Sequence, residues 1–281
     1  MKILLTTDWY KPVVNGVVTS VINLKKELES RGHEVRVLTL SRSYESYAEN
    51  GVYYIKSLNL EKIYPNARAV LPHMEPFVRE LIWWNPDVVH SQCEFMTFSY
   101  ELKISKKCQC PLIHTYHTVY EDYIHYLPGG LSNYKTGAKL ERKAVACFSK
   151  MILSRTSQVI VPTKKVENIL KKYGVGEPVS VMPTGVDLSR FKEPITLEEK
   201  NAVKKRLGIP LENKVLVSVG RLAKEKNLEE LLEYFAKLVR EGNGKNLTFL
   251  IAGDGPDRER LEKLAEELGI KDQVVFTGMI S

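Results

Sequence analysis

The sequence has few of the features that mark secreted, membrane-spanning or metal-stabilised proteins. Only four of its 281 residues are cysteine, and the close pair, Cys108 and Cys110, lacks the spacing of zinc and redox motifs. No apolar run approaches the ~20 residues that span a bilayer, and the run after Lys2 is too short for a secretory signal. We therefore expect reduced thiols and a protein that stays in the cytosol or lies on a membrane without crossing it.

Signals of other ligand classes are missing as well. The loop after the first apolar run lacks G-x-G-x-x-G spacing, which disfavours a Rossmann dinucleotide site. The net charge of +7 suits nucleic acid, an anionic membrane surface or phosphorylated ligands. Among these, nucleic acid is disfavoured, because the basic residues are neither concentrated in one arm nor interleaved with stacking aromatics.

Short apolar runs that alternate with helical patterns dominate the first part of the chain. Residues 2–7 are predicted to form a buried strand, and residues 17–30 a helix that Gly32 ends. Residues 34–40 are predicted to form the next strand, so the chain starts with a βαβ unit and a parallel sheet. Further strands are predicted at residues 52–56, 87–91, 112–116 and 159–162.

A second α/β unit is predicted after the turn-rich segment around Pro183, which places the domain boundary between residues 182 and 183. Glu193–Lys205 is charged and looks solvated. The helix at 228–239 is amphipathic, and the residues on its apolar face are Leu228, Leu231, Leu232, Phe235, Leu238 and Val239. These elements make up half of a doubly wound domain, so we expect the natural protein to continue past Ser281. The other predicted elements of this unit are strands at 214–220, 247–253 and 273–277 and a helix at 258–268.

Three loops that follow predicted strands carry residues suited to anionic ligands. Gly16 begins a helix, where free amide groups and the helix dipole favour a phosphate or carboxylate, although a plain turn glycine explains it too. Arg221 and Lys226 follow the strand at 214–220 and could neutralise a diphosphate. Gly253 and Gly255 permit a tight turn and a close approach of the backbone to a nucleotide.

A histidine-rich segment follows the strand at 112–116. His117 falls at the end of the strand, where it could donate to a substrate or handle a proton near neutral pH, although a structural role explains a lone histidine too. His114, His117 and His125 do not favour a metal site, because a three-residue gap on a strand points His114 and His117 to opposite faces. We expect His114 to pack within the sheet.

Motifs in order along the chain resemble the family-4 retaining glycosyltransferases of GT-B fold. Nearest among them are the bacterial glucosyltransferases that build mono- and diglucosyl-diacylglycerol, because H-T-Y-H-T-x-Y-E-D-Y-x-H-Y and the closing F-T-G-M-I are similar to theirs. The resemblance covers nearly the whole chain. The motifs that carry it are N-G-V-V-T-S, H-T-Y-H-T-x-Y-E-D-Y, V-I-V-P-T, M-P-T-G-V-D, G-R-L-x-x-E-K-N and A-G-D-G-P.

The resemblance implies two Rossmann-like, doubly wound domains with parallel sheets. Residues 1–182 would face the acceptor and the membrane, and residues 183–281 would be an incomplete nucleotide-sugar domain. The implied activity is a hexosyltransferase that uses UDP-glucose without a metal or other cofactor. Its acceptor would be diacylglycerol or glucosyl-diacylglycerol, and the protein would lie peripherally on the inner face of a bacterial cell membrane.

The resemblance also implies roles for individual residues. Arg221 and Lys226 would contact the donor diphosphate, the Gly16 loop would lie against it, and His117 would lie beside the transferred sugar. Preplaced cations and N–H groups that stabilise a departing diphosphate act by electrostatic catalysis. The family's pair of downstream glutamates is missing, so we expect this chain alone to bind donor poorly and to have little activity.

Membrane contact has two interpretations. Lysine and arginine residues between 103 and 150 could attract an anionic surface, with apolar neighbours dipping into the headgroup layer, but an ordinary solvated helix face explains them equally. The basic candidates are Lys103, Lys106, Lys107, Lys135, Lys139, Arg142, Lys143 and Lys150, and the apolar ones are Tyr126, Leu127, Leu131 and Tyr134.

Several alternatives stay open. The acceptor could be soluble or a phospho-sugar, or the chain could be a truncated module without catalytic activity. The sequence does not give the identity of the sugar, the number of sugars in the product or the oligomeric state.

Overall fold

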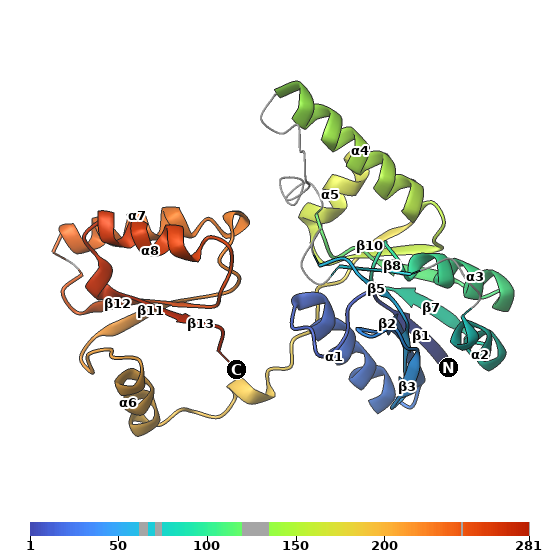
Figure 1. The fold of residues 1–281 in the computed structure, drawn as a ribbon, viewed down its shortest axis with the longest axis horizontal. Coiled ribbons are helices and arrows are strands. Elements are labelled where there is room, and N and C mark those ends of the chain that lie inside the picture. The colour runs from blue at the N-terminus through green and yellow to red at the C-terminus, as the bar shows by residue number, and fades with distance from the viewer. Residues whose placement is uncertain (62–66, 71–74, 120–134, 243, 281) are drawn as a thin grey trace. The chain divides into compact units, whose positions relative to one another are not determined.

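The computed structural model describes residues 1–61, 67–70, 75–119, 135–242 and 244–280, and the chain forms two compact units, Met1–Asp187 and Leu188–Ser281 (Figure 1). The predicted boundary lies a few residues earlier. Residues 183–187 stay with the first unit because Asn23 Nδ2 donates to the carbonyl of Gly185 at 3.5 Å and Lys26 pairs with Asp187 at 3.5 Å.

An eight-stranded sheet forms the centre of the first unit. Its strand order is β10-β9-β8-β7-β1-β2-β4-β3, and every neighbouring pair is parallel except β3 and β4. The order reverses beside β1, so the connections run outward in both directions from the middle of the sheet. The strands are β1 (Lys2–Thr6), β2 (Glu34–Leu40), β3 (Tyr47–Glu49), β4 (Val52–Ile55), β7 (Val88–Ser91), β8 (Leu112–Thr115), β9 (Gln158–Val161) and β10 (Val179–Val181).

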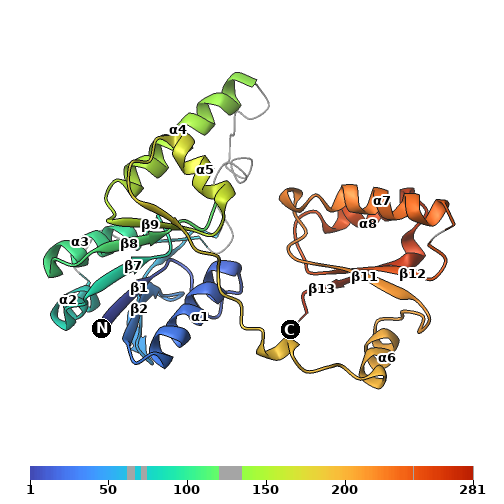
Figure 2. The same cartoon turned by 180° about the vertical axis from the view of Figure 1, so that it is seen from behind.

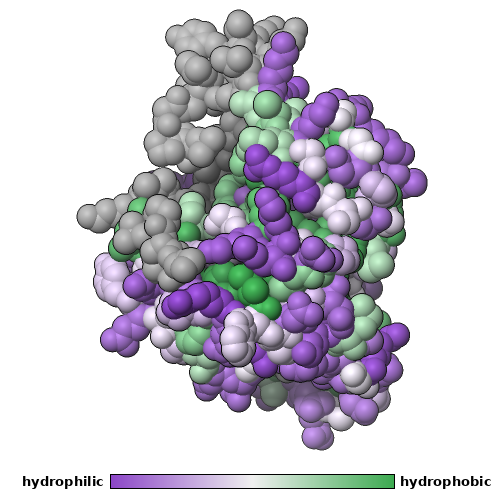
Figure 3. Space-filling view, turned by 90° about the vertical axis from the view of Figure 1, so that its right-hand side faces the viewer, coloured by the Kyte–Doolittle hydropathy of each residue, from purple (hydrophilic) through white to green (hydrophobic). Residues whose placement is uncertain are grey.

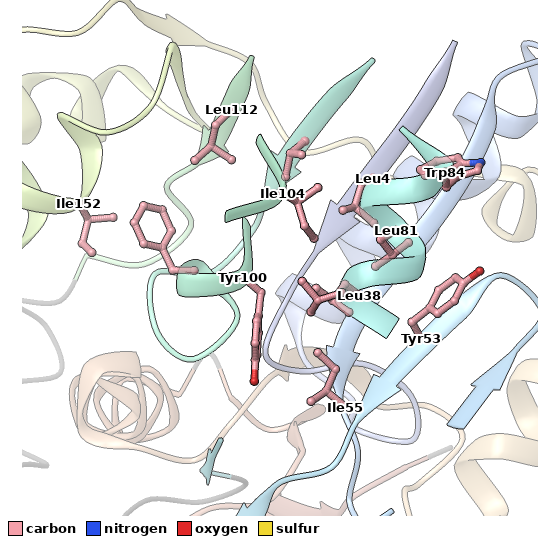
Figure 4. Close-up of a cluster of buried hydrophobic side chains, with 13 residues drawn as sticks. Leu4, Leu38, Tyr53, Ile55, Leu81, Trp84, Tyr100, Ile104, Leu112 and Ile152 are labelled. Atoms are coloured by element: carbon pink, nitrogen blue, oxygen red, sulfur yellow. The ribbon is translucent and has the colours of Figure 1, made fainter. Parts of the chain in front are cut away.

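Helices cover both faces of this sheet, because its strands are apolar on both sides. Leu4 and Leu38 pack with Leu81 and Ile104 in one core cluster, shown in Figure 4. The next residue, Leu5, belongs to a second cluster that includes helix α1. The helices are α1 (Gly16–Ser30), α2 (Pro76–Trp84), α3 (Phe98–Cys108), α4 (Lys135–Leu153) and α5 (Lys164–Tyr173), and a small antiparallel pair joins β5 (Leu58–Asn59) to β6 (Arg68–Ala69).

The second unit contains a smaller parallel sheet of order β11-β12-β13. Helices α7 and α8 lie over one face of it (Figures 1 and 2), and Leu232, Phe235, Phe249 and Leu261 form the centre of its core. The elements are η3 (Ser189–Phe191), α6 (Leu197–Arg206), β11 (Lys214–Val219), η4 (Lys224–Lys226), α7 (Leu228–Arg240), β12 (Leu247–Ala252), α8 (Arg258–Glu267), η5 (Lys271–Gln273) and β13 (Val274–Gly278).

Most predicted strands and helices occur within one or two residues of their expected ends. Two features of the second unit differ from expectation. The apolar face predicted for α7 included Leu231 and Leu238, yet both are exposed, because the buried stripe runs through Leu228, Leu232 and Phe235 instead. The charged stretch is solvated, as expected, because helix α6 within it buries no side chain; the helix itself, which starts with a capping box, was not predicted.

Polar side chains dominate the described surface on the face of the molecule that Figure 3 presents, and hydrophobic ones form small patches between them. No described helix has the length and apolar character needed to cross a membrane.

Candidate functional site

The loops that follow β1, β7 and β8 meet at the carboxyl edge of the large sheet, because these strands are neighbours and parallel. Asp8 follows β1, Gln92 to Glu94 follow β7, and His117 follows β8. The first polar residues of these loops are largely buried. The edge is therefore a dense polar cluster built on rigid strands.

His117 is held by a residue that the sequence did not single out. Its Nε2 lies 2.8 Å from Oε1 of Gln92, a buried amide. An amide oxygen only accepts, so Nε2 of His117 carries the proton and Nδ1 keeps a lone pair. Burial lowers the pKa of His117 to about 4, although Glu94 opposes this effect. At neutral pH His117 is therefore an uncharged hydrogen-bonding group, which disfavours the predicted proton-handling role.

His114 packs inside the sheet, as predicted. Its ring is fully buried, with Nδ1 at 2.9 Å from Ser91 Oγ and Nε2 at 3.0 Å from Glu94 Oε1. Ser91 is the last residue of β7, and Glu94 lies in the loop that follows it. These two hydrogen bonds therefore join β7 and its loop to β8. His114 therefore helps to fix the loop from which Gln92 reaches His117.

Two buried carboxyl groups complete the cluster. Asp8 accepts hydrogen bonds from the amides of Met96 and Thr97, at 2.9 and 2.8 Å, at the start of α3. Glu101 is fully buried, and neither carboxyl oxygen has a hydrogen-bond partner within the described part of the chain. Burial raises the pKa of Glu101 to about 7, against the effect of the nearby Ser91 hydroxyl. Glu101 could have been noticed in the sequence, since it lies midway between Phe98 and Ile104 on an apolar helical stripe.

Gly16 begins helix α1, as the anion-site prediction requires. Asn15 caps the helix by accepting from the amide of Val18 at 2.8 Å. A Cβ added at Gly16 would meet nothing within 4 Å. The space beside Gly16 is therefore open, and packing within the described chain does not require glycine there.

Gly253 and Gly255 have a structural reason to be glycine that differs from the predicted one. A Cβ at Gly253 would lie 1.9 Å from the carbonyl oxygen of Gly220, and one at Gly255 would lie 2.2 Å from that of Leu222. The loops after β11 and β12 also share hydrogen bonds, with the amide of Leu222 donating to the carbonyl of Asp254 at 3.0 Å. Contact between these loops therefore requires both glycines, whether or not a nucleotide approaches them.

Arg221 and Lys226 lie in the loop after β11, at the carboxyl edge of the small sheet. Arg221 is half-buried and Lys226 is exposed at the end of η4. Asn227 follows in a left-handed conformation, with φ of 49°, and helix α7 begins after it. The structure thus places the two predicted cations at one edge of one strand, next to the loop that holds Gly253 and Gly255.

A cavity of about 260 Å³ opens at the carboxyl edge of the first sheet, beside the loop that leads to Gly16. Its walls come from the β1–α1 loop, the end of β2, strands β3 and β4, and the β5–β6 pair. Both aromatic and charged side chains line it. The lining residues are Asp8, Trp9, Tyr10, Lys11, Pro12, Val13, Leu40, Arg42, Tyr47, Tyr54, Glu61 and Arg68.

Only some of the residues predicted to contact a membrane lie in the described part of the chain. Lys106 and Lys107 lie in the last turn of α3 with exposed side chains, and Lys143 and Lys150 are exposed on α4. Outside the described residues lie His125, Tyr126, Leu127, Leu131 and Tyr134, as do the side chains of Lys135 and Lys139.

Two family descriptions match the chain. Residues 14–190 match Glycosyltransferase Family 4, and residues 199–281 match Glycosyl transferases group 1. Among curated relatives, the alpha-monoglucosyldiacylglycerol synthases of Streptococcus pneumoniae and Acholeplasma laidlawii are 33% and 34% identical over 100% of the chain. The chain spans 62% of the length of the first relative and 70% of the second.

Solved structures share the fold at low sequence identity. Anabaena HepE in complex with UDP-glucose has a TM-score of 0.64 and 16% identity, with 100% of this chain and 70% of HepE covered. WaaG, a glycosyltransferase involved in lipopolysaccharide biosynthesis, has a TM-score of 0.62 and 17% identity, with 99% of this chain and 70% of WaaG covered.

Proposed function

This chain belongs to glycosyltransferase family 4, and from that premise we propose that it transfers glucose from UDP-glucose to diacylglycerol or glucosyl-diacylglycerol at a membrane surface. Its fold is of the GT-B class, as predicted, with the parallel sheets of two α/β units. One observation carries the proposal: the whole chain matches two alpha-monoglucosyldiacylglycerol synthases.

In this proposal the donor is bound mainly by the second unit. Arg221 and Lys226 supply positive charge at the carboxyl edge of β11, where open α/β sheets bind their ligands. A guanidinium gives a forked contact to a phosphate, and an ammonium gives a point charge. Both groups stabilise charge that grows on the diphosphate as the glycosidic bond breaks.

The transfer retains the configuration of the sugar and needs no metal. The acceptor hydroxyl oxygen attacks the anomeric carbon, the bond from that carbon to the diphosphate oxygen breaks, and the leaving phosphate takes the hydroxyl proton. His117 contributes as a neutral group whose Nδ1 accepts a hydrogen bond from a sugar hydroxyl. Its low pKa agrees with this role, because a base on the protein is not required.

The proposed location is the inner face of the cell membrane. The exposed lysines at the end of α3 and along α4 support it, since each basic residue near an anionic leaflet contributes ~1 kcal/mol. Binding should weaken as salt is added, because exposed charges are screened.

The test is transfer of radiolabelled glucose from UDP-glucose to diacylglycerol and glucosyl-diacylglycerol in anionic liposomes, by the full-length gene product. We expect transfer to at least one lipid, and Arg221→Ala to weaken UDP-glucose binding by about tenfold or more. If the protein transfers no sugar and Arg221→Ala leaves nucleotide affinity unchanged, the proposal fails.

A phosphorylated soluble acceptor is the second candidate function. The observation that favours it is the presence of Lys11, Arg42 and Arg68 around the cavity of the first unit. Guanidinium and ammonium groups form strong charge-assisted hydrogen bonds with phosphate. Co-sedimentation with anionic liposomes that weakens as salt is added would favour the lipid acceptor, and no binding to liposomes would favour the soluble one.

A further inference from the structure

A row of polar side chains crosses three neighbouring strands beneath helix α3. Thr6 of β1 is in register with Ser91 of β7, and Ser91 is in register with His114 of β8. Leu4 and Leu112, two residues earlier on β1 and β8, pack in the core cluster that includes residues of α3 (Figure 4). Side chains two residues apart share a face of a strand, so the polar row also faces α3. Its three side chains are fully buried.

The carboxyl group of Glu101, on α3, meets this row. It lies close to the hydroxyls of Thr6, Ser91 and Thr97. Within the described residues, however, neither carboxyl oxygen of Glu101 nor the hydroxyl of Thr6 has a hydrogen-bond partner. A buried polar group without a partner costs ~1–3 kcal/mol. We therefore expect small rotations of these side chains to bring the carboxyl and the hydroxyls into hydrogen bonds.

Ser91 has already committed its proton. Its hydroxyl oxygen lies 2.9 Å from Nδ1 of His114 and 3.2 Å from the carbonyl oxygen of Cys93. Nε2 of His114 faces the Glu94 carboxylate at 3.0 Å and carries a proton, so Nδ1 of the neutral ring accepts from Ser91. A hydroxyl has one proton, so whichever acceptor it serves, Ser91 can only accept from Glu101.

Thr97 is committed in the same way. Its Oγ1 donates to Oδ1 of Asp8 at 2.8 Å. The carboxyl of Glu101 therefore meets two hydroxyls that accept, those of Ser91 and Thr97, and one that can donate, that of Thr6. A protonated carboxyl has one O–H donor and a carbonyl acceptor and matches this set. An ionised carboxyl only accepts and does not match it.

The surroundings of Glu101 favour the protonated form as well. Burial raises the pKa of Glu101 to about 7, although nearby hydroxyls and His114 lower it. Helix α2 contributes apolar side chains to the same core. The titratable groups on the strands and loops around Glu101 are Asp8 after β1, Cys93 and Glu94 after β7, and His114 on β8.

We propose that Glu101 is a positioning residue that acts on His117 through the β7–α3 loop. Its protonated carboxyl donates to Ser91, and Ser91 holds His114. These contacts fix the loop from which Gln92 reaches His117. Ionised Glu101 instead draws the Ser91 proton away from His114, and the loop loses this anchor. The link to sugar transfer rests on the proposed function, but the coupling of Glu101 to the two rings does not.

The first experiment follows the histidine rings without donor or transfer. Nitrogen-15 NMR of the histidine-labelled 281-residue chain records the ring shifts of His114 and His117 between about pH 6 and about pH 8.5. We expect both rings to shift with one midpoint near 7, although the pKa of His117 itself is about 4. Glu101→Gln should abolish this step, because an amide donates and accepts at every pH.

The second experiment measures glucose transfer from UDP-glucose by the full-length protein over the same pH range. The wild-type kcat should fall about tenfold as Glu101 ionises, as expected for the loss of a buried hydrogen bond. Glu101→Gln should retain the wild-type kcat of the acidic end within about twofold and remove the fall. Glu101→Leu, which fills the space without a donor, should lower kcat about tenfold at every pH.

Glu167→Gln is the matched control. Glu167 is a buried glutamate on another helix of the same unit, α5. Hydrogen bonds from Lys164 and Lys171 hold the pKa of Glu167 below its usual value, so this carboxylate stays ionised throughout the range. Its replacement should leave the shape of the pH profile and the step in the ring shifts unchanged.

Three results would overturn the proposal. They are wild-type ring shifts without a step near pH 7, the same step in Glu101→Gln, or a kcat of Glu101→Gln as low as that of Glu101→Leu. The wild-type NMR titration does not depend on the folding of any variant. If the full-length protein transfers no sugar, the proposed function fails, whereas the ring shifts still decide whether Glu101 is coupled to His117.

Discussion

The first strands of the two units have similar sequences and different surroundings. β1 lies between two neighbours, β7 and β2, and helices cover both faces of its sheet, so four of its five residues are buried. In the described part of the second unit β11 pairs with β12 alone, and Leu216, Val217 and Val219 are 46%, 58% and 74% exposed. The burial of a strand is therefore set by its neighbours rather than by its own residues.

The same contrast applies to polar groups. At the carboxyl edge of the first sheet, burial keeps His117 uncharged at neutral pH and makes Glu101 hard to ionise. The corresponding edge of the second sheet presents the basic residues Arg221 and Lys226. The first edge thus includes polar side chains that burial keeps uncharged or makes hard to ionise, whereas the loop after β11 presents two cations.

The largest expected effect on stability comes from replacing a glycine. Gly253 has no room for a side chain, whereas Gly16 has open space beside it. Gly253→Ala should destabilise the second unit by about 4 kcal/mol, combining backbone strain at φ of +140° with a clash against Gly220, each worth ~1–3 kcal/mol. Gly16→Ala should change stability by less than ~0.5 kcal/mol. Urea unfolding of both variants checks this, and equal destabilisation would contradict the comparison.

The apolar residues of β1 and β11 provide the next test. Leu5→Ala should destabilise the first unit by about 3–4 kcal/mol, because Leu5 is fully buried. Val217→Ala should cost the second unit less than ~1 kcal/mol, since its side chain is already in water. The free energy of unfolding of each variant is measured by chemical denaturation, and a cost at Val217 as large as that at Leu5 would show that β11 is covered in solution.

Glu101 should make the stability of the first unit depend on pH. Its pKa is about 7 in the folded state and 4.5 when exposed, so the folded protein holds a proton that the unfolded one loses. Stability should therefore fall as pH rises from about 4.5 to 7, by at most about 3 kcal/mol, and then level off. Glu101→Gln should remove this fall. Unfolding free energies at several pH values provide the measurement, and the same slope in the variant would point to another group.

The smallest expected effect concerns the ionisation of His117. Gln92→Glu places a carboxylate against Nε2, which stabilises the imidazolium and should raise the pKa of His117 from about 4 by about one unit or more. NMR titration of labelled histidines measures the change. Thr115→Val is the control, because it removes an equal 2.8 Å contact from His90 and leaves that of His117 intact. An unchanged His117 titration would show that Gln92 does not face the ring.

Local patterns allowed most of the fold to be predicted. The apolar run of β1 and the alternation of β2 marked strands, and Gly32 marked the end of α1, because each signal arises from neighbouring residues. Helix α3 was not predicted as an element, although the buried residues Phe98 and Ile104 flank Glu101 at helical spacing. Leu231 was wrongly predicted to lie on the apolar face that α7 buries. Helical spacing shows which residues share a face but not how much of that face the sheet covers.

The candidate site was predicted less completely than the fold. Loops after strands identified His117, Gly16, Arg221 and Lys226 as residues at sheet edges, and the structure places them there. Gln92 and Glu94 escaped notice, because their roles depend on contacts with histidines twenty or more residues away in the sequence. The reason for Gly253 was also invisible in sequence, since the clashing carbonyl belongs to a different loop.

The joined loops of the second unit have a practical consequence for protein engineering. The amide of Gly220 donates to the carbonyl of Ala252, and the amide of Leu222 donates to that of Asp254, both at 3.0 Å. The conformation of each loop therefore depends on the other. A peptide tag or extra residue grafted into either loop would shift its register and break the pairing. Insertions meant to carry a label should therefore go elsewhere, such as the solvent-facing start of α6.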